Sequence, residues 1–375
     1  MIFVPTLACN CRCLHCFEEL NGHSIEISKL EIIFEKMLEL AETVQCRTLS
    51  LYWIGGEVLC LNPDVVQKIL AVAARVFQGS GITLAHRLQT NLLLYDSGKW
   101  QDVLAGAFQG RVSSSLDFPN LYRQAPGLGA DEYLKAWLGK KETAERDGLK
   151  ISVISLPNPH TLRLGAERFY LFFQEEVRVR NLQINFPFPG RNTPLQLLDL
   201  PEFARFMADL YELWIAAGRN LHLSPFMYLE NRLLHQSAEQ NCWSSFSCAT
   251  NFLAMGPDGT VGQCDYFVST VNTVKEFNFG SLIDEPMDKI FNSPQRRLFL
   301  DRPLRLMQNS PCGECRFWKL CHGGCPTRAF TFTGNLFSPD HYCPVYQAMF
   351  SAILERGAVH AQQVLRSHEG EIHDS

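Results

Sequence analysis

The sequence predicts an α/β fold followed by a smaller, cysteine-rich region. Six short apolar segments alternate with helical patterns over the first 220 or so residues, and such alternation indicates a parallel sheet with helices packed outside it. After about residue 230 the cysteines become dense, the helices short and the turns frequent. Six βα units can form either a doubly wound sheet or an incomplete barrel, so the pattern alone leaves both architectures open.

The predicted strands are rich in Val, Ile, Leu or Phe, as buried parallel strands are. In chain order they are Ile2–Leu7, Thr48–Ile54, Ile82–Asn91, Arg111–Asp117, Lys150–Ser155 and Asn181–Pro187. In both architectures the chemistry is carried at the carboxyl ends of the strands. We therefore expect functional residues directly after these segments.

The clearest predicted helix begins at Pro63, with Asn62 as its cap and Val66, Ile69 and Ala73 on one apolar face. The other helical patterns cover Ile27–Thr43, Lys99–Ala107, Ala130–Glu145, Leu162–Phe173 and Pro201–Ala217. Further along, "FLAMGPDGTVGQC" predicts a hairpin that turns at Asp258–Gly259.

Charge and hydropathy exclude several classes of function. The net charge is −5 and no basic stripe is interleaved with aromatic residues, so we expect no nucleic-acid partner. No apolar stretch reaches 18 residues and no signal peptide is recognisable, which predicts a cytoplasmic protein without a membrane partner. Disulfides are disfavoured there, so the 14 cysteines favour metal or iron–sulfur ligation.

The stretch "CNCRCLHC" directly follows the first predicted strand. Cys9, Cys13 and Cys16 have the spacing C-x3-C-x2-C, and Cys11 lies among them as a predicted bystander. Three thiolates on one loop suit a [4Fe–4S] cluster that keeps one iron without a protein ligand. A structural zinc site would normally recruit a fourth protein ligand.

A second motif, "WIGGE", ends the second predicted strand and contains Gly55, Gly56 and Glu57. Taken alone it fits an ordinary strand-to-helix turn. Together with the cysteine triplet it resembles the radical S-adenosylmethionine (SAM) superfamily. The resemblance implies a partial (β/α)6 TIM-like barrel in which the open iron chelates SAM. Reductive cleavage of SAM then gives a 5′-deoxyadenosyl radical that abstracts hydrogen from the substrate. It also implies that the two glycines leave backbone groups open to SAM and that Glu57 receives its ammonium group.

Three further residues carry weaker likenesses to the same superfamily. "SSLD" implies that Ser115 touches the SAM ribose, although it equally fits a polar strand end. "LQTN" implies that Gln89 bonds near SAM or substrate, and a loop-capping role fits as well. His15 stands where the superfamily usually has an aromatic residue beside the adenine, and its flat ring can serve there.

Eight later cysteines make two sets of four, which suits two closed iron–sulfur clusters or two zinc sites. Their spacing resembles the SPASM extension of radical SAM enzymes, in the form found in anaerobic sulfatase-maturing enzymes. The resemblance implies three [4Fe–4S] clusters in all, with two auxiliary ligand sets. These are Cys242, Cys248, Cys264 and Cys325 for the first, and Cys312, Cys315, Cys321 and Cys343 for the second.

The same resemblance makes Asp265, which follows the hairpin cysteine, a base acting on the substrate. The alternative is a carboxylate that caps a turn. We expect three regions: a radical SAM partial barrel over 1–230, an auxiliary-cluster domain over 231–348, and a helix and polar tail over 349–375. The remaining Cys46 and Cys60 fit buried apolar positions.

The resemblance implies an oxidoreductase that modifies a peptide or protein residue, by oxidation or crosslinking, with electrons from a donor such as flavodoxin or ferredoxin. Met1 lies eight residues before Cys9, so we expect no leader-binding domain ahead of the barrel. A SPASM dehydrogenase or epimerase of a sugar or alcohol is the alternative enzyme. A non-catalytic zinc-binding interaction protein is the alternative of another class.

Overall fold

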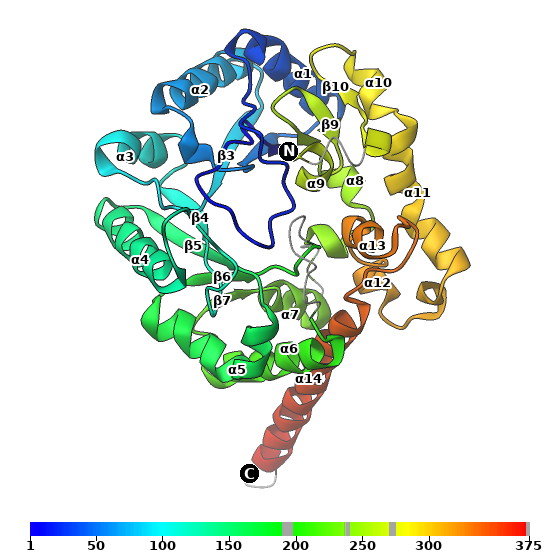
Figure 1. The fold of residues 1–375 in the computed structure, drawn as a ribbon. Helices are drawn as coiled ribbons and strands as arrows, with labels where there is room; N and C mark the ends of the chain where they lie inside the picture. The colour runs from blue at the N-terminus through cyan, green and yellow to red at the C-terminus, as the bar shows by residue number, and fades with distance from the viewer. Residues whose placement is uncertain (190–197, 236, 238–240, 270–274, 373–375) are drawn as a thin grey trace. The chain divides into compact units, whose positions relative to one another are not determined.

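The computed structural model describes residues 1–189, 198–235, 237, 241–269 and 275–372 (Figure 1). The chain forms two compact units. The first unit comprises Met1–Leu156, Pro187–Leu195 and Ser247–Leu304, and the second comprises Pro157–Phe186, Gln196–Phe246 and Arg305–Ser375. These units do not test the region boundaries expected near residues 230 and 348, which stay a prediction.

The sheet of the first unit is built on parallel strands in chain order, each paired with the next. They are β1 (Ile2–Phe3), β2 (Thr48–Trp53), β3 (Thr83–Thr90), β4 (Arg111–Ser115) and β5 (Lys150–Ser155). On the free side of β1 the sheet continues through β8 (Ala254–Met255), β9 (Thr260–Gly262) and β10 (Gly280–Ser281). β8 runs parallel to β1, and β9 runs antiparallel to both of its neighbours. The carboxyl ends of β1 to β5 therefore meet at one edge of this sheet.

Helices α1 (Leu30–Thr43), α2 (Pro63–Phe77), α3 (Ser97–Gly106) and α4 (Ala130–Arg146) lie on the outer side of these parallel strands (Figure 1). Short helical turns of the same part are η1 (Ile27–Lys29) and η2 (Val58–Cys60). The later part adds α8 (Cys248–Asn251), α9 (Asp265–Ser269), η5 (Lys275–Phe277), α10 (Met287–Phe291) and the start of α11 (Pro294–Asn309). The core packs aromatic edges onto faces, for instance Trp53 against Phe3 at 4.9 Å and Phe108 at 5.5 Å between ring centroids.

The second unit contains a parallel pair, β6 (Asn181–Ile184) and β7 (His222–Ser224). Its larger helices are α5 (Pro159–Leu171), which continues into a π-helical turn at Phe172–Glu176, α6 (Leu200–Ala216), α7 (Phe226–Leu234), α13 (Pro326–Thr333) and α14 (Cys343–Ile372). Short helical turns are η4 (Cys242–Ser244), η6 (Pro311–Glu314) and α12 (Trp318–Cys321). The long α14 packs on α6 and α7, so the last cysteine of the chain begins a helix anchored in this core.

The predicted strands are present, most of them shorter by a few residues, and the predicted helices are present with ends that differ by no more than a few residues. The strand expected at Ile2–Leu7 ends at Phe3, since Pro5 has no amide hydrogen for a ladder and Leu7 N instead bonds His23 O at 2.7 Å. β7 was not predicted, because three residues are too few to show a period. The hairpin and its turn are confirmed, with Gly259 at φ 84°. Along the described residues, no helix unites the length and apolar character that crossing a membrane requires.

Candidate active site

The cysteine loop Cys9–Cys16 leaves the carboxyl end of β1 and is fixed to the segment that follows β4. Arg12 N donates to Gln124 O and Leu14 N to Tyr122 O, both at 2.8 Å. Within the loop, Cys11 N donates to Cys9 Sγ at 3.3 Å and Cys16 N to Cys13 O at 3.1 Å. These bonds hold the thiols on one loop at the edge of the sheet where the chemistry was expected.

The thiols of this loop interact with one another. Cys11 is 2% exposed, its thiol is hydrogen-bonded to those of Cys9 and Cys13, and it accepts from Asn91 Nδ2 at 3.3 Å. The Cys11 bond, helped by the nearby Arg123 charge, lowers the pKa of Cys13 to about 6, whereas burial raises that of Cys16 to about 12. A thiolate favoured near neutral pH suits an iron ligand. The assignment of Cys11 as the bystander stays a prediction.

Gly55 and Gly56 lie directly against the segment that leads into the cysteine loop. Gly56 N donates to Thr6 O at 3.1 Å, and Glu57 N donates to Ala8 O at 2.7 Å. A Cβ at Gly55, whose φ is 126°, would lie 2.6 Å from Thr6 O, and one at Gly56 would lie 2.3 Å from Ala8 O. No side chain fits at either position, so the motif brings its backbone against the loop.

Glu57 is 2% exposed and joins the ends of two strands. Its carboxylate accepts from Thr90 Oγ1 and from Asn91 N, both at 2.6 Å, and from Leu59 N at 2.9 Å. Burial raises the pKa of Glu57, although these three hydrogen bonds oppose the shift. Glu57 is thus held in one orientation beside the cysteine loop.

Gln89 and Ser115 come together at the ends of β3 and β4, with Gln89 Nε2 donating to Ser115 Oγ at 3.5 Å. His15 Nδ1 lies 3.9 Å from Asp117 Oδ2, and burial lowers the pKa of His15 to about 4. The ring is therefore neutral at physiological pH.

Sequence reasoning missed the buried ion pair beneath the loop. Arg123 Nη2 donates to Asp117 Oδ1 at 3.1 Å, and Arg123 Nε lies 3.0 Å from Asp117 Oδ2. Both side chains are at least nine-tenths buried. Arg123 follows no strand and belongs to no motif, so only its place in a stretch otherwise poor in charge could have singled it out.

Asp265 begins α9 and is half-buried, and burial raises its pKa. Glu18, which the sequence did not single out, has a pKa well above its usual range, first because of burial and then because of the Asp265 charge. The rings of Phe17, Phe188 and Tyr266 pack on one another, with centroids 5.4 to 6.1 Å apart, and Phe17 and Tyr266 adjoin Glu18 and Asp265 in sequence. The first unit thus brings the two carboxyls into charge interaction, and Glu18 also interacts with Cys9 and Cys13.

Four cysteines predicted as one closed set line a single cavity of the second unit. These are Cys312, Cys315, Cys321 and Cys343, and Phe317, Trp318, Gly323, Pro339, Tyr346, Gln347 and Phe350 complete the wall. Four cysteines on the wall of one mostly apolar space suit a cluster with four protein ligands. Within the described residues, no three or more His, Cys, Asp or Glu side chains are placed to hold a single metal ion. Of the other set, Cys242 and Cys325 belong to the second unit, and Cys248 and Cys264 belong to the first.

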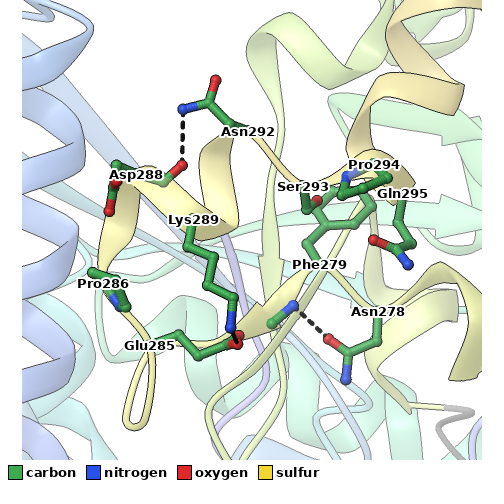
Figure 2. A pocket seen from close by; sticks show the side chains of 11 residues that line it. Asn278, Phe279, Glu285, Pro286, Asp288, Lys289, Asn292, Ser293, Pro294 and Gln295 are labelled. Carbon is green, nitrogen blue, oxygen red and sulfur yellow. Dashed lines mark hydrogen bonds and ion pairs between the residues drawn. The ribbon is translucent and has the colours of Figure 1, made fainter.

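A larger and more open hollow of about 670 Å³ lies in the first unit between β10, α10 and the start of α11 (Figure 2). Carboxamides and charged groups line it, including Asn278, Asn292, Asp288 and the Glu285–Lys289 ion pair. None of the residues that the sequence singled out lies on its wall.

The chain is similar to one protein family and to two curated proteins. The SPASM family, described as an iron-sulfur cluster-binding domain, matches residues 242–316. A "cysteine-type anaerobic sulfatase-maturating enzyme" of Clostridium perfringens strain 13 is 23% identical over 364 residues, which are 93% of this chain and 94% of that protein. Its counterpart from strain ATCC 13124 gives the same figures.

Solved structures show the same fold. "Native anSMEcpe with bound AdoMet and Kp18Cys peptide" superposes with a TM-score of 0.80 at 19% identity, covering 97% of this chain and 99% of that one. Streptococcus suis SuiB bound to precursor peptide SuiA gives a TM-score of 0.58 at 16% identity, over 91% and 75% of the two chains. The predicted α/β class and the resemblance to the SPASM domain and to anaerobic sulfatase-maturing enzymes are thereby confirmed.

Proposed function

We propose that this protein is a radical SAM oxidoreductase that modifies a peptide or protein residue. The observation that carries the proposal is the cysteine loop at the end of β1, fixed beside the buried Glu57 and the two glycines. Relatives that match nearly the whole chain are sulfatase-maturating enzymes, and three of the matched structures contain a bound peptide. Iron–sulfur clusters and SAM are the cofactors that these residues suit.

The residues divide into three ligand sets and a SAM site. Cys9, Cys13 and Cys16 would hold the open cluster, and the two sets of four would hold auxiliary clusters. When bound, the clusters and SAM supply an electron and a carbon radical able to abstract hydrogen. The chain's own part is to hold SAM, through Gly55, Gly56, Glu57, Ser115, Gln89 and His15.

Asp265 is the group proposed to take a proton from the substrate. It follows Cys264 at the start of α9 and interacts electrostatically with Glu18, which in turn interacts with Cys9 and Cys13. A base must lie within reach of the proton that it removes, and the charge interaction that links Asp265 through Glu18 to the cysteine loop supports this role. A flavodoxin or ferredoxin would supply the electrons.

Metal content and product analysis test the proposal. Anaerobically prepared protein should be brown and contain about twelve irons, four in each of three clusters. With SAM, a reductant and peptides encoded by neighbouring genes, mass spectrometry should detect a peptide lighter by about two mass units, as loss of two hydrogens requires. Colourless protein with about two zinc ions would refute the proposal. Turnover of a sugar or alcohol with every peptide unchanged would refute the peptide substrate.

A further inference from the structure

Asp340 lies where segments carrying three of the predicted iron ligands meet in the second unit. Its main chain bonds on both sides: Asp340 N donates to Gly323 O, and Cys343 N donates to Asp340 O, both at 3.0 Å. Its side chain accepts from Cys325 N at 2.7 Å. One residue thus ties the Cys321–Cys325 loop to the start of α14.

The Asp340 carboxylate also accepts hydrogen bonds from a buried guanidinium and a buried phenol. Arg328 Nη2 donates to Asp340 Oδ2 at 2.9 Å, and Tyr346 Oη donates to the same oxygen at 2.7 Å. Arg328 also donates to the Tyr346 hydroxyl. Asp340 is 2%, Arg328 6% and Tyr346 0% exposed, so water screens these charges poorly.

Tyr346 links this group of side chains to the cysteine cavity and to Trp243. Its side chain lines the cavity of Cys312, Cys315, Cys321 and Cys343. Its ring also stacks on Trp243, at 4.3 Å between centroids and 2° between planes, and Trp243 directly follows Cys242. The group formed by Asp340, Arg328 and Tyr346 therefore contacts segments assigned to both auxiliary ligand sets. Cys242 and Cys325 belong to one set, and Cys321 and Cys343 to the other.

We propose that Asp340, Arg328 and Tyr346 are positioning residues shared by the two auxiliary clusters. The charges of Asp340 and Arg328 set the reduction potentials of both clusters together. The inference rests on the proposed function, because it assumes that clusters occupy these cysteines. A cluster's potential depends on nearby charge, hydrogen bonds and solvent exposure. One electron added to a cluster is opposed by a nearby carboxylate and favoured by a nearby guanidinium, so the paired charges act in opposite directions.

The decisive test compares two single variants of this pair in the anaerobically prepared holoprotein. Cluster potentials are read by redox titration followed by electron paramagnetic resonance. Asp340→Asn should shift both auxiliary potentials to more positive values, and Arg328→Gln should shift both to more negative values. Shifts in one direction for both variants, a shift in one auxiliary cluster alone, or no shift would overturn the proposal.

The second unit supplies a matched control. Glu230 accepts from Tyr211 Oη at 2.9 Å and from Arg219 Nη2 at 2.6 Å, so it forms another carboxylate–arginine–tyrosine group. Among its described contacts no cysteine occurs. Glu230→Gln should leave the potentials unchanged, and an equal shift in this variant would mean that any buried charge has the effect.

Iron content decides the case in which Asp340→Asn cannot hold its clusters. Loss of both auxiliary clusters together, from about twelve to about four irons, supports a shared role, whereas Cys343→Ala should lose one cluster alone. Loss of a single cluster in Asp340→Asn would overturn the proposal. Tyr346→Phe, which keeps the ring stacked on Trp243, should shift both potentials by less than Asp340→Asn does. Wild-type protein without iron would instead refute the proposed function.

Discussion

The cysteine loop of the first unit and the cysteine cavity of the second differ in what surrounds their thiols. Around the loop lie charged side chains, among them Glu57 and the Asp117–Arg123 pair. The cavity is walled mainly by aromatic rings and a proline, for example Phe317, Trp318 and Pro339. A small number of placed polar or charged groups orients a bound small molecule, and the loop offers more of them than the cavity wall does. This difference supports the proposed roles, with chemistry at the loop and electron storage in the cavity.

Cys13 of the loop differs in acidity from two thiols of the cavity, although burial raises the pKa of Cys16 in the loop as well. The hydrogen bond from Cys11 and the charge of Arg123 lower the pKa of Cys13 to about 6. In the cavity, burial raises the pKa of Cys321 to about 12 and that of Cys343 to about 11. Cys321 and Cys343 therefore keep their protons until metal displaces them.

The largest expected effect comes from removing a ligand of the loop. Cys13→Ala should abolish 5′-deoxyadenosine formation from SAM, because two thiolates cannot hold the open cluster, and should leave about eight irons in place. Chromatography of the nucleoside and an iron assay measure both. Cys60→Ala is the control and should keep all iron, because Cys60 lies outside the three sets. The sequence-based expectation of a buried position was wrong for Cys60, which is exposed. Continued 5′-deoxyadenosine formation by Cys13→Ala would count against the open-cluster assignment.

Asp265→Asn should slow peptide modification without stopping SAM cleavage. Loss of a general base typically costs 10²- to 10⁴-fold in rate, so peptide modification should fall by about that factor while SAM is still cleaved. Mass spectrometry of the peptide and a nucleoside assay are run on the same samples. Asp258→Asn is the matched control on the same hairpin, since the retained amide oxygen can still accept from Thr260 N. Equal peptide turnover in Asp265→Asn and wild type would remove the base assignment.

The sequence predicted those parts of the site that depend on local pattern. Apolar runs indicate the parallel strands. The resemblance to the SPASM extension, rather than the intervals alone, grouped Cys312, Cys315, Cys321 and Cys343 as one set, and these four residues line one cavity. Asn62 as the cap of α2 is a further example, since its side chain accepts from Asp64 N at 2.9 Å.

Contacts between residues far apart in sequence could not be predicted in this way. Arg123 meets Cys13 only because two backbone bonds dock the loop on the segment after β4. Glu18 meets Asp265 across about 250 residues of chain, and nothing in either local motif indicates the partner. Asp340 was overlooked for the same reason, because its partners are assembled by the path of α13 and α14.

Exposure to an iron chelator should distinguish the two regions by rate. The open cluster has an iron without a protein ligand, so about four of twelve irons should be removed first, and 5′-deoxyadenosine formation should be lost with them. Added SAM should slow this phase alone, because it would cover the open position. Iron content and nucleoside formation followed over time provide the measurement. If iron is lost early while SAM cleavage continues, the more labile iron does not belong to the cysteine loop, and the predicted order of iron loss is wrong.

The smallest expected effect is that of Cys11→Ala, which tests which cysteines of the loop bind iron. The Cys11 thiol is hydrogen-bonded to both Cys9 and Cys13 and accepts from Asn91 Nδ2, so its loss should cost on the order of 1 kcal/mol in stability, as loss of a small buried group does. Iron content should stay at about twelve and SAM cleavage within about twofold of wild type, a factor that corresponds to under 1 kcal/mol of barrier. If Cys11→Ala instead loses about four irons while Cys9→Ala keeps them, the ligand triplet must be reassigned to Cys11, Cys13 and Cys16.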